Sequence, residues 1–139
     1  MLFHQTQVRV RYADTDQMQY VYYGKYPEYF EVARTELIRA VGLTYKEMEA
    51  QGVMLPVAEL NIRYFRPALY DDLLTIKTTI SQFPDRQLIT NCEIFNENGD
   101  LLTRGIVKLV YVNTTTMRPM RAPEWLVEKF QAMWQEDEA

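Results

Sequence analysis

Two aspartates one residue apart, Asp14 and Asp16, stand in a segment that is otherwise rich in tyrosine. The segment follows an alternating, strand-like run and leads directly into the pattern of an amphipathic helix. A carboxylate just before a helix lies near the positive end of the helix dipole and near backbone N–H groups that have no partner in the helix. Such a place can hold an acyl carbonyl group and stabilise the negative charge that develops on its oxygen. The segment therefore predicts a site for acyl chemistry at a helix N-terminus.

A structural role for the same aspartates is the alternative interpretation. Aspartate is common in turns and at the entry of helices, where its side chain bonds to nearby backbone N–H groups. Spacing alone does not separate a turn residue from a reactive carboxylate, so both interpretations of Asp14 and Asp16 stay open. The tyrosines Tyr20, Tyr22 and Tyr23 are equally open, either as packing groups or as the lining of a pocket.

Other chemistries are excluded by what the sequence lacks. His4 is the only histidine and Cys92 is the only cysteine. A Ser-His-Asp triad, a Cys-His pair and a zinc site built from histidine or cysteine each need such residues in suitable places. We expect His4 to be a solvated side chain near the N-terminus and Cys92 to be a small core residue. No metal site is expected, and carboxylates and tyrosines remain for acid–base or nucleophilic work.

The composition predicts one globular domain. With 139 residues, 47% of them apolar, residues 1–139 are expected to form a single domain with one core and a frayed acidic tail at 136–139. A net charge of −4 argues against a nucleic-acid partner, because duplex binding needs a broad basic surface. No apolar run is long enough for a membrane span, and no signal peptide is visible. We therefore expect a cytoplasmic protein.

Hydrophobic periodicity predicts the helices. Apolar residues recur at three-and-four spacing over residues 26–41, with Pro27 in the first turn and Gly42 just after the end. This pattern predicts the longest helix of the chain, of roughly 15 residues. A Thr-x-x-Glu pattern at 44–47 predicts a capping box that opens a short helix. Another amphipathic helix is expected from Pro123 onward.

Alternating apolar residues predict the strands. They fall at residues 6–12, 54–65, 73–83, 87–95 and 101–112, and the second of these strands is expected to contain a kink or bulge. An Asn-Gly pair at 98–99 predicts the hairpin between the last two strands. Strands grouped after a helix indicate the α+β class with a mainly antiparallel sheet. We expect this sheet to curl around the long central helix.

Four stretches of the sequence resemble one protein family. They are Tyr-Ala-Asp-Thr-Asp at 12–16 followed by Val-Tyr-Tyr at 21–23, Phe-Glu-Val-Ala-Arg-Thr-Glu at 30–36, Tyr-Phe-Arg-Pro-Ala-Leu-Tyr-Asp-Asp at 64–72, and the strand at 104–112. Over roughly residues 8–130 the chain is similar to the 4-hydroxybenzoyl-CoA thioesterase family of hotdog-fold acyl-CoA thioesterases. The resemblance implies a hotdog fold and homodimers joined edge to edge, or homotetramers. It also implies hydrolysis of acyl-CoA thioesters to free acid and CoA, without a metal and with no cofactor besides the CoA of the substrate.

Roles for individual residues follow from this resemblance. It implies that Asp16 is the catalytic carboxylate and that backbone N–H groups near Tyr23 and Gly24 polarise the thioester carbonyl. The chain departs from the family's pattern at Gln19, where glycine is usual, and at Lys25, where asparagine is usual.

An acyl-CoA substrate needs further side chains for its acyl group and its phosphates. The candidates for the acyl pocket, from the tyrosine-rich segment and the apolar face of the helix, are Tyr20, Tyr22, Tyr26 and Phe30. The candidates for the CoA phosphates, by their charge and their position in the last strand and the following loop, are Arg104, Lys108, Arg118 and Arg121.

Several questions stay open at this point. The sequence does not separate a nucleophile from a general base at Asp16, and it does not fix the length or aromatic character of the acyl group. An acyl-carrier-protein thioesterase is an alternative enzyme, although its basic docking surface is disfavoured by the net charge of −4. A non-catalytic acyl-CoA-binding module is the other alternative, which the departures at Gln19 and Lys25 keep open.

Overall fold

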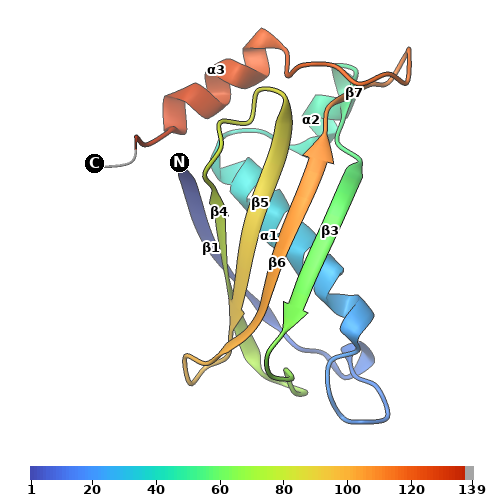
Figure 1. Ribbon diagram of the computed structural model, residues 1–139, viewed down its shortest axis with the longest axis vertical. Helices are drawn as coiled ribbons and strands as arrows, with labels where there is room; N and C mark the ends of the chain where they lie inside the picture. Colours follow the sequence, from blue (N-terminus) through green and yellow to red (C-terminus); the bar gives the residue numbers. More distant parts are fainter. Residues whose placement is uncertain (137–139) are drawn as a thin grey trace.

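The structure, a computed structural model, describes residues 1–136. Its main element is a five-stranded antiparallel sheet with the strand order β1-β4-β5-β6-β3. The long helix α1 lies across one face of this sheet, and the C-terminal helix α3 lies over its upper end (Figure 1). The strands are β1 (Leu2–Arg9), β3 (Val57–Tyr64), β4 (Leu73–Ile80), β5 (Gln87–Phe95) and β6 (Leu101–Val110). The predicted α+β class, with a mainly antiparallel sheet packed on a long helix, is confirmed.

Helix α1 spans Tyr26–Ala40 and has the 15 residues that its periodicity predicts. Pro27 lies in the first turn, where a missing N–H removes no hydrogen bond. Gly42 follows the helix with a φ of 95°, a conformation that glycine adopts without strain. One face of the helix is buried and packs mainly over β1 and β4. The buried positions are Tyr26, Tyr29, Phe30, Ala33, Arg34, Leu37 and Ile38.

A tight contact between the helix and the sheet lies where Phe30 meets Gly105 of β6. Phe30 has no solvent exposure. A Cβ atom placed on Gly105 would lie 2.4 Å from carbons of the Phe30 ring. The ring therefore occupies the space that any larger residue at position 105 would need. Phe30 is a core residue that sets the distance between the helix and the sheet.

The remaining elements surround this core. Helix α2 (Tyr45–Ala50) begins at Thr44, whose side-chain oxygen accepts the N–H of Glu47 at 3.1 Å. Helix α3 spans Glu124–Met133 and follows Pro123, as predicted. Two short strands, β2 (Val53–Met54) and β7 (Val112–Asn113), form a separate two-stranded sheet. No helix within residues 1–136 combines the length and the apolar character that crossing a membrane requires.

Four strand predictions differ from the structure. The strand expected at 101–112 is divided into β6, which ends at Val110 in the main sheet, and β7, which pairs with β2. The strand expected at 54–65 is divided into β2 and β3, and the register shifts between Val57 and Glu59 where a bulge was expected. The first strand spans Leu2–Arg9 rather than 6–12, and it ends early because residues 12–14 turn into a short 3-10 helix. The strand that begins at Leu73 ends at Ile80 rather than at residue 83, just ahead of the turn before β5.

The chain termini also depart from expectation. His4 lies within β1, is half-buried, and its buried Nδ1 atom has no hydrogen-bond partner among residues 1–136, so the predicted solvated side chain is wrong. The backbone N–H of Gln135 donates to the carbonyl of Met1 at 3.0 Å, which ties the two ends of the described chain together. The predicted frayed tail at 136–139 falls largely on residues 137–139, which lie outside the described residues.

We predict that Gly105→Ala destabilises the protein by about 1–3 kcal/mol, because the added methyl group overpacks the contact with the Phe30 ring. Urea denaturation measures this loss as a lower midpoint. Ile106→Ala is the control, since the neighbouring side chain is 39% exposed on the other face of the same strand. Ile106→Ala should lower the free energy of unfolding by clearly less than Gly105→Ala does. Equal midpoints for Gly105→Ala and the wild type would contradict the packing described here.

Candidate active site

The first of the two aspartates, Asp14, is a buried anchor. Its side chain is 1% exposed. Its Oδ2 atom accepts the backbone N–H of Arg11 at 3.0 Å and the hydroxyl of Tyr29 at 2.8 Å. Its Oδ1 atom lies 3.2 Å from a guanidinium nitrogen of Arg11 and 3.6 Å from the Nζ of Lys25. Asp14 therefore links the 3-10 turn at Tyr12–Asp14 to helix α1 through Tyr29 and to the helix entry through Lys25.

These contacts keep Asp14 charged in the folded protein. Burial alone would raise the pKa of its carboxyl group. The hydrogen bonds from the Arg11 N–H, the Tyr29 hydroxyl and the Arg11 guanidinium outweigh burial and lower the pKa below its ordinary value of 3.8. Burial and the hydrogen bond to Asp14 raise the pKa of Tyr29, so that its hydroxyl stays a proton donor. A charged carboxylate at this depth is tolerated because its oxygens have partners.

The loop after Asp14 is held on both sides by backbone hydrogen bonds. The N–H of Tyr22 donates to the carbonyl of Asp14 at 2.8 Å, and the N–H of Asp16 donates to the carbonyl of Tyr20 at 2.9 Å. The N–H of Val21 donates to the carbonyl of Ala68 at 2.9 Å, which docks the loop on the segment after β3. The position of Asp16 is therefore fixed by the backbone around it.

The second aspartate, Asp16, is half-buried and has one oxygen to spare. Its Oδ1 atom accepts the N–H of Met18 at 2.8 Å, and its carbonyl accepts the N–H of Gln19 at 3.0 Å. Asp16 is thus a turn residue, one of the two interpretations that the sequence allowed. Its Oδ2 atom accepts no hydrogen bond from residues 1–136. The interpretation of Asp16 as a reactive carboxylate therefore keeps a physical basis, because a free carboxylate oxygen is available.

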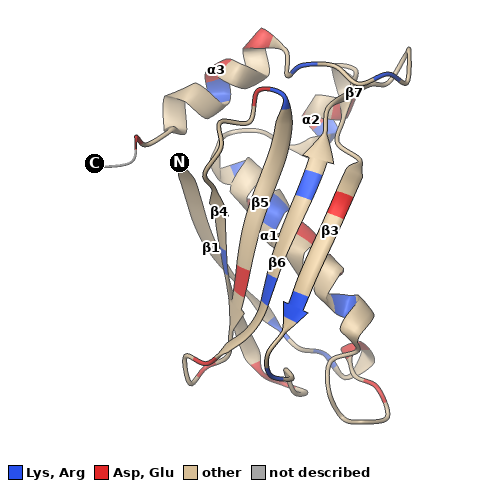
Figure 2. Ribbon diagram, viewed as in Figure 1, with Lys and Arg blue, Asp and Glu red and all other residues tan. Residues whose placement is uncertain are grey.

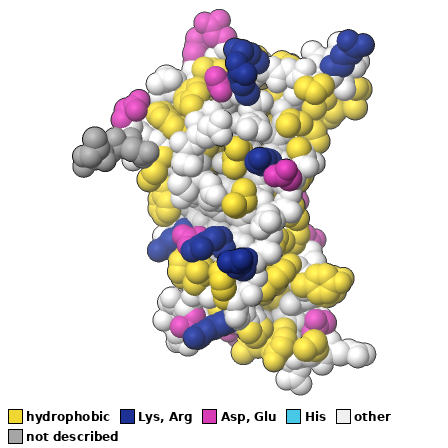
Figure 3. Space-filling view, viewed as in Figure 1, with side chains coloured by type: hydrophobic (Ala, Val, Ile, Leu, Met, Phe, Trp, Pro, Cys, Tyr) yellow, Lys and Arg dark blue, Asp and Glu magenta, His cyan; other side chains and the backbone are white. Residues whose placement is uncertain are grey.

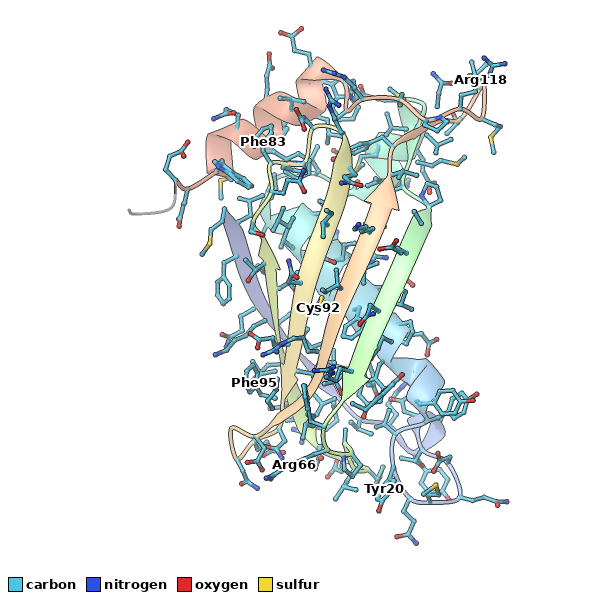
Figure 4. The ribbon with its side chains drawn as sticks, viewed as in Figure 1. Tyr20, Arg66, Phe83, Cys92, Phe95 and Arg118 are labelled. Carbon is cyan, nitrogen blue, oxygen red and sulfur yellow. The ribbon has the colours of Figure 1, made fainter. Side chains whose placement is uncertain are left out.

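A cavity of about 350 Å³ lies beside Asp16. It extends between the loop, the entry of helix α1 and the end of β3, at the lower end of the molecule where Tyr20 and Arg66 are labelled in Figure 4. Its lining is mostly aromatic and apolar, with Asp16 and Arg66 as its charged members. The lining residues are Asp16, Met18, Tyr20, Val21, Tyr23, Tyr26, Tyr64, Phe65, Arg66 and Pro67. A second, larger cavity of about 570 Å³ shares Asp16, Met18 and Tyr20 with the first.

Free backbone donors stand at the entry of helix α1. A single 3-10 turn, Tyr23–Lys25, precedes the helix. Within residues 1–136 the N–H groups of Tyr23 and Gly24 donate no backbone hydrogen bond, whereas the N–H of Lys25 donates to the carbonyl of Tyr22 at 2.8 Å. Free N–H groups at a helix N-terminus form an electropositive site for a partly charged oxygen.

The side chains around these donors explain the glycine at position 24. The Tyr22 ring lies so close that a Cβ atom on Gly24 would be 2.6 Å from one of its carbons. The hydroxyl of Tyr64 donates to the carbonyl of Tyr23 at 2.9 Å, which ties the turn to the end of β3. A hydrogen bond with the Tyr23 hydroxyl, and to a lesser degree the charge of Asp16, raise the pKa of Tyr22. The turn and the Tyr22, Tyr23 and Tyr64 side chains are thus close neighbours.

The predicted pocket residues divide between the cavity and the core. Tyr20 and Tyr26 line the cavity, as does the ring of Tyr23. Tyr22 lies against Gly24 rather than in the cavity lining, and Phe30 lies in the core against Gly105.

The cavity also has lining residues that sequence reasoning did not select. Tyr64, Phe65 and Arg66 close the cavity from the end of β3. Their aromatic and basic character was visible in the sequence at 64–66. Their proximity to Asp16 depends on long-range backbone pairing, which a single sequence does not display.

The predicted phosphate-binding residues are spread along the molecule. Arg104 lies on β6 with its guanidinium carbon 6.0 Å from the centre of the Phe65 ring, so it is adjacent to the cavity. Lys108 is further along β6 and pairs with Glu59 at 3.4 Å. Arg118 lies at the opposite end of the molecule from Tyr20 and Arg66 (Figure 4). Arg121 follows it in the same exposed loop. Within one chain, only Arg104 of the four lies beside the cavity.

Both departures from the family pattern have a structural effect. Gln19 adopts a φ of 68°, in the left-handed region that favours glycine, so a non-glycine residue is held there at some strain. Lys25 lies 2.8 Å from a Glu28 oxygen as well as 3.6 Å from Asp14.

Comparisons with known proteins agree on the kind of molecule. Residues 10–130 match the family model described as the thioesterase-like superfamily. The acyl-CoA thioester hydrolase YbgC of Escherichia coli O6:H1 is 33% identical, with 88% of this chain and 92% of that protein covered. The acyl-CoA thioesterase YbgC of Haemophilus influenzae is also 33% identical, with 84% and 86% covered. A solved DHNA-CoA thioesterase from Staphylococcus aureus superposes with a TM-score of 0.86 at 36% identity, with 95% of this chain and 93% of that chain covered.

We predict that Tyr29→Phe lowers the free energy of unfolding by about 1.5–3 kcal/mol near neutral pH, because it removes a donor to a buried carboxylate. The low pKa of Asp14 stabilises the fold above its ordinary value of 3.8, and that contribution is lost as the pH falls through the folded-state pKa. The difference between wild type and variant should therefore shrink in acid. Denaturation at several pH values measures it.

Tyr12→Phe is the control for this experiment, because Tyr12 is 79% exposed on the same turn. It should change stability by no more than about 0.5 kcal/mol. A deficit in Tyr29→Phe that is the same at pH 3 as at about pH 7, or no deficit at all, would contradict the role given to Asp14.

Proposed function

The chain belongs to the thioesterase-like superfamily, and we propose that its tyrosine-lined cavity is the place where it hydrolyses the thioester bond of an acyl-CoA. Its relatives in Escherichia coli and Haemophilus influenzae, 33% identical over most of both chains, are named as hydrolases of this bond. This chain is an enzyme of the same class, an acyl-CoA thioesterase that releases a free acid and CoA. One observation carries the choice of site: Asp16, whose Oδ2 atom accepts no hydrogen bond within residues 1–136, and Tyr23, whose N–H is free at the helix entry, line one cavity.

The first part of the proposed mechanism is carbonyl activation. The thioester carbonyl oxygen accepts hydrogen bonds from the N–H groups of Tyr23 and Gly24. These donors are positioned before the reaction begins, so they stabilise the charge that develops on the oxygen with little rearrangement. The dipole of α1 adds to the effect, because its positive end points toward the same place.

The second part is the action of Asp16. Its Oδ2 atom either attacks the carbonyl carbon or takes a proton from a water molecule that attacks it. In both routes the carbon–sulfur bond breaks and the electron pair leaves with sulfur as the CoA thiolate, which then gains a proton from solvent. In the first route water must also cleave the acyl anhydride formed with Asp16. A thiol has a pKa of about 8.5, so it leaves without a strong general acid. No metal or further cofactor is needed.

The lining of the cavity favours an aromatic acyl group. Rings of Tyr20, Tyr23, Tyr26, Tyr64 and Phe65 surround the space beside Asp16. Favourable ring–ring contacts contribute about 0.5–1.5 kcal/mol each beyond the burial of area. This supports the finer resemblance to the 4-hydroxybenzoyl-CoA thioesterase family, whose namesake acyl group is aromatic.

We predict that the protein releases free thiol from at least one member of a panel of acetyl-, hexanoyl-, palmitoyl- and benzoyl-CoA, with benzoyl-CoA preferred over hexanoyl-CoA. Asp16→Asn should lower kcat for the best substrate about 100-fold or more, since it removes the only group proposed to act as nucleophile or base. Thermal unfolding checks that the variant is folded. A thiol-trapping reagent measures the rate.

Asp71→Asn is the matched control, because it makes the same change of charge in an exposed loop, at a φ of 69° that asparagine tolerates. It should hydrolyse the substrate at the wild-type rate. Undiminished turnover by a folded Asp16→Asn variant would remove Asp16 from the mechanism. Binding of acyl-CoA without release of thiol from any panel member would favour the non-catalytic binding module instead.

We also propose that two copies join through β3. This strand is at the end of the sheet, and α1 packs mainly over β1 and β4, so both faces of β3 stay largely exposed. A groove of about 160 Å³ runs between α1 and β3 and includes Leu60 and Arg34. Leu60 is 43% exposed although it faces the helix side. Arg34 is 8% exposed, yet its side chain bonds only to the Tyr45 hydroxyl within residues 1–136. A partner at this edge covers Leu60 with apolar side chains and supplies hydrogen-bond acceptors for Arg34.

Sedimentation velocity tests this proposal. We predict that the wild type sediments at twice the mass of one chain or a multiple of it, and that Leu60→Lys shifts it to the mass of a single chain, because a charge is placed in the apolar contact. Val32→Lys is the control, since Val32 has the same 43% exposure but lies on α1 away from the groove. A monomeric wild type, or dissociation only in the control, would contradict an interface at β3.

A further inference from the structure

Two arginines face each other directly on the outer surface of the sheet. Arg63 of β3 and Arg104 of β6 are register partners in the antiparallel pair. Like charges directly opposite on neighbouring strands repel and destabilise the pairing. Arg104 is relieved by Glu93, which lies 3.1 Å away on the next strand. No carboxylate among residues 1–136 lies within ion-pair distance of the Arg63 guanidinium. The pair needs an explanation beyond the stability of the sheet.

The pair lies next to the cavity that contains Asp16. The chain runs from Arg63 through Tyr64 to Phe65 and Arg66, and the last three of these line the cavity. The Arg104 guanidinium carbon is 6.0 Å from the centre of the Phe65 ring. Phe65 is 45% exposed, so its ring forms part of the surface between the cavity and the two arginines. A molecule that leaves the cavity past Phe65 meets the arginines next.

Arg66 adds a third positive charge at the same place. Its guanidinium lies 3.4 Å from Asp100. Arg63, Arg66 and Arg104 therefore have two carboxylate partners between them, Glu93 and Asp100, and carry an excess positive charge. Figure 2 shows the basic ends of β3 and β6 side by side, and Figure 3 shows dark blue side chains gathered over the lower half of this face. This local excess is notable on a chain whose net charge is −4.

Lys108 on the same surface of β6 provides a contrast. It pairs with Glu59 of β3 at 3.4 Å, and Glu59 is its register partner. At this position the two strands place opposite charges face to face, as sheet stability favours. The same two strands place like charges face to face only four residues away on β6, at the end beside the cavity. This difference between the two pairs indicates that the two arginines serve a ligand rather than the stability of the sheet.

We propose that Arg63, Arg66 and Arg104, the arginine cluster, bind the phosphate groups of the CoA nucleotide. This rests on the proposed function, because it takes the acyl end of the same substrate to lie beside Asp16. Planar guanidinium groups match phosphate oxygens with two parallel hydrogen bonds, and a phosphorylated nucleotide carries several negative charges at once. The flexible arm of CoA spans from the thioester past Phe65 to the cluster. The phosphates then supply the counter-charge that Arg63 lacks.

The experiment compares two substrates that differ only in the nucleotide: an acyl-CoA and the same acyl group on pantetheine. In the wild type the KM for acyl-CoA should be far lower than that for acyl-pantetheine. In Arg63→Gln and Arg104→Gln the KM for acyl-CoA should rise toward the KM for acyl-pantetheine. Each variant should lose about 10- to 100-fold of the preference for acyl-CoA, as expected for charge-assisted hydrogen bonds. Calorimetric binding of free CoA and of pantetheine gives the same comparison without turnover. Thermal unfolding confirms that each variant is folded.

Lys108→Gln and Arg118→Gln are the matched controls, because they make the same change of charge at a paired lysine and at an arginine on the far end of the molecule. Both should keep the wild-type preference for acyl-CoA. The proposal is overturned if Arg63→Gln and Arg104→Gln keep that preference, or if Arg118→Gln abolishes it. It is overturned as well if the wild type shows no preference.

The two proposals fail separately. If CoA binding depends on Arg63 and Arg104 but no thioester is hydrolysed, the phosphate site is supported and the proposed reaction is contradicted. If hydrolysis depends on Asp16 but acyl-CoA and acyl-pantetheine keep their wild-type KM ratio in both arginine variants, the reaction is supported. The arginine cluster is then not the phosphate site. Inorganic pyrophosphate as a competitor reports on the cluster alone: it should raise the KM for acyl-CoA in the wild type and not in Arg63→Gln.

Discussion

The buried carboxylate of Asp14 is the interaction on which the site depends. It joins three neighbouring parts of the chain: the 3-10 turn through Arg11, the entry of α1 through Lys25, and the first turn of α1 through Tyr29. A charge at this depth would destabilise the fold if any of these donors were absent. Because they are present, the loop that follows can have only a narrow range of positions. That loop carries Asp16, whose Oδ2 atom accepts no hydrogen bond within residues 1–136.

A second constraint operates between the helix and the sheet. The Phe30 ring fills the space above Gly105, so α1 lies close to β6 at that point. The helix packs mainly over β1 and β4, which leaves room at the β3 side and at the helix entry. Tyr64 bridges part of that room with its hydrogen bond to the Tyr23 carbonyl. The aromatic cavity therefore forms where tight packing ends, and the arginine cluster lies on the outer side of the same strand ends.

The sequence predicted those features that depend on local patterns. The period of apolar residues located β5 with its observed bounds and α1 to within one residue, and Thr44 marked the start of α2. Asp16, Tyr23 and Gly24 were selected as candidates; in the structure Asp16 and Tyr23 line one cavity, and Gly24 follows Tyr23 in the turn before α1. Their chemical roles remain proposals. Local signals of this kind can be recognised in a single sequence, because caps, turns and amphipathic faces are set by residues near one another in the chain.

What the sequence could not provide depends on contacts between distant segments. Nothing in the spacing of the two aspartates told the anchor from the free carboxylate, because Tyr29 makes that distinction. Phe30 was expected in the pocket, but its contact with Gly105 spans most of the chain and places it in the core. The same reason explains why Arg118 was grouped with Arg104: the late loop and the late strand are close in sequence and end at opposite ends of the fold.

The most direct test of this account is a crystal structure of the Asp16→Asn variant with an intact acyl-CoA. The account predicts the thioester carbonyl oxygen within about 3 Å of the N–H groups of Tyr23 or Gly24, the side chain at position 16 beside the carbonyl carbon, and the nucleotide phosphates on Arg63 and Arg104. An acyl group bound in that variant away from the helix entry, in the same chain and in any partner chain, would contradict it.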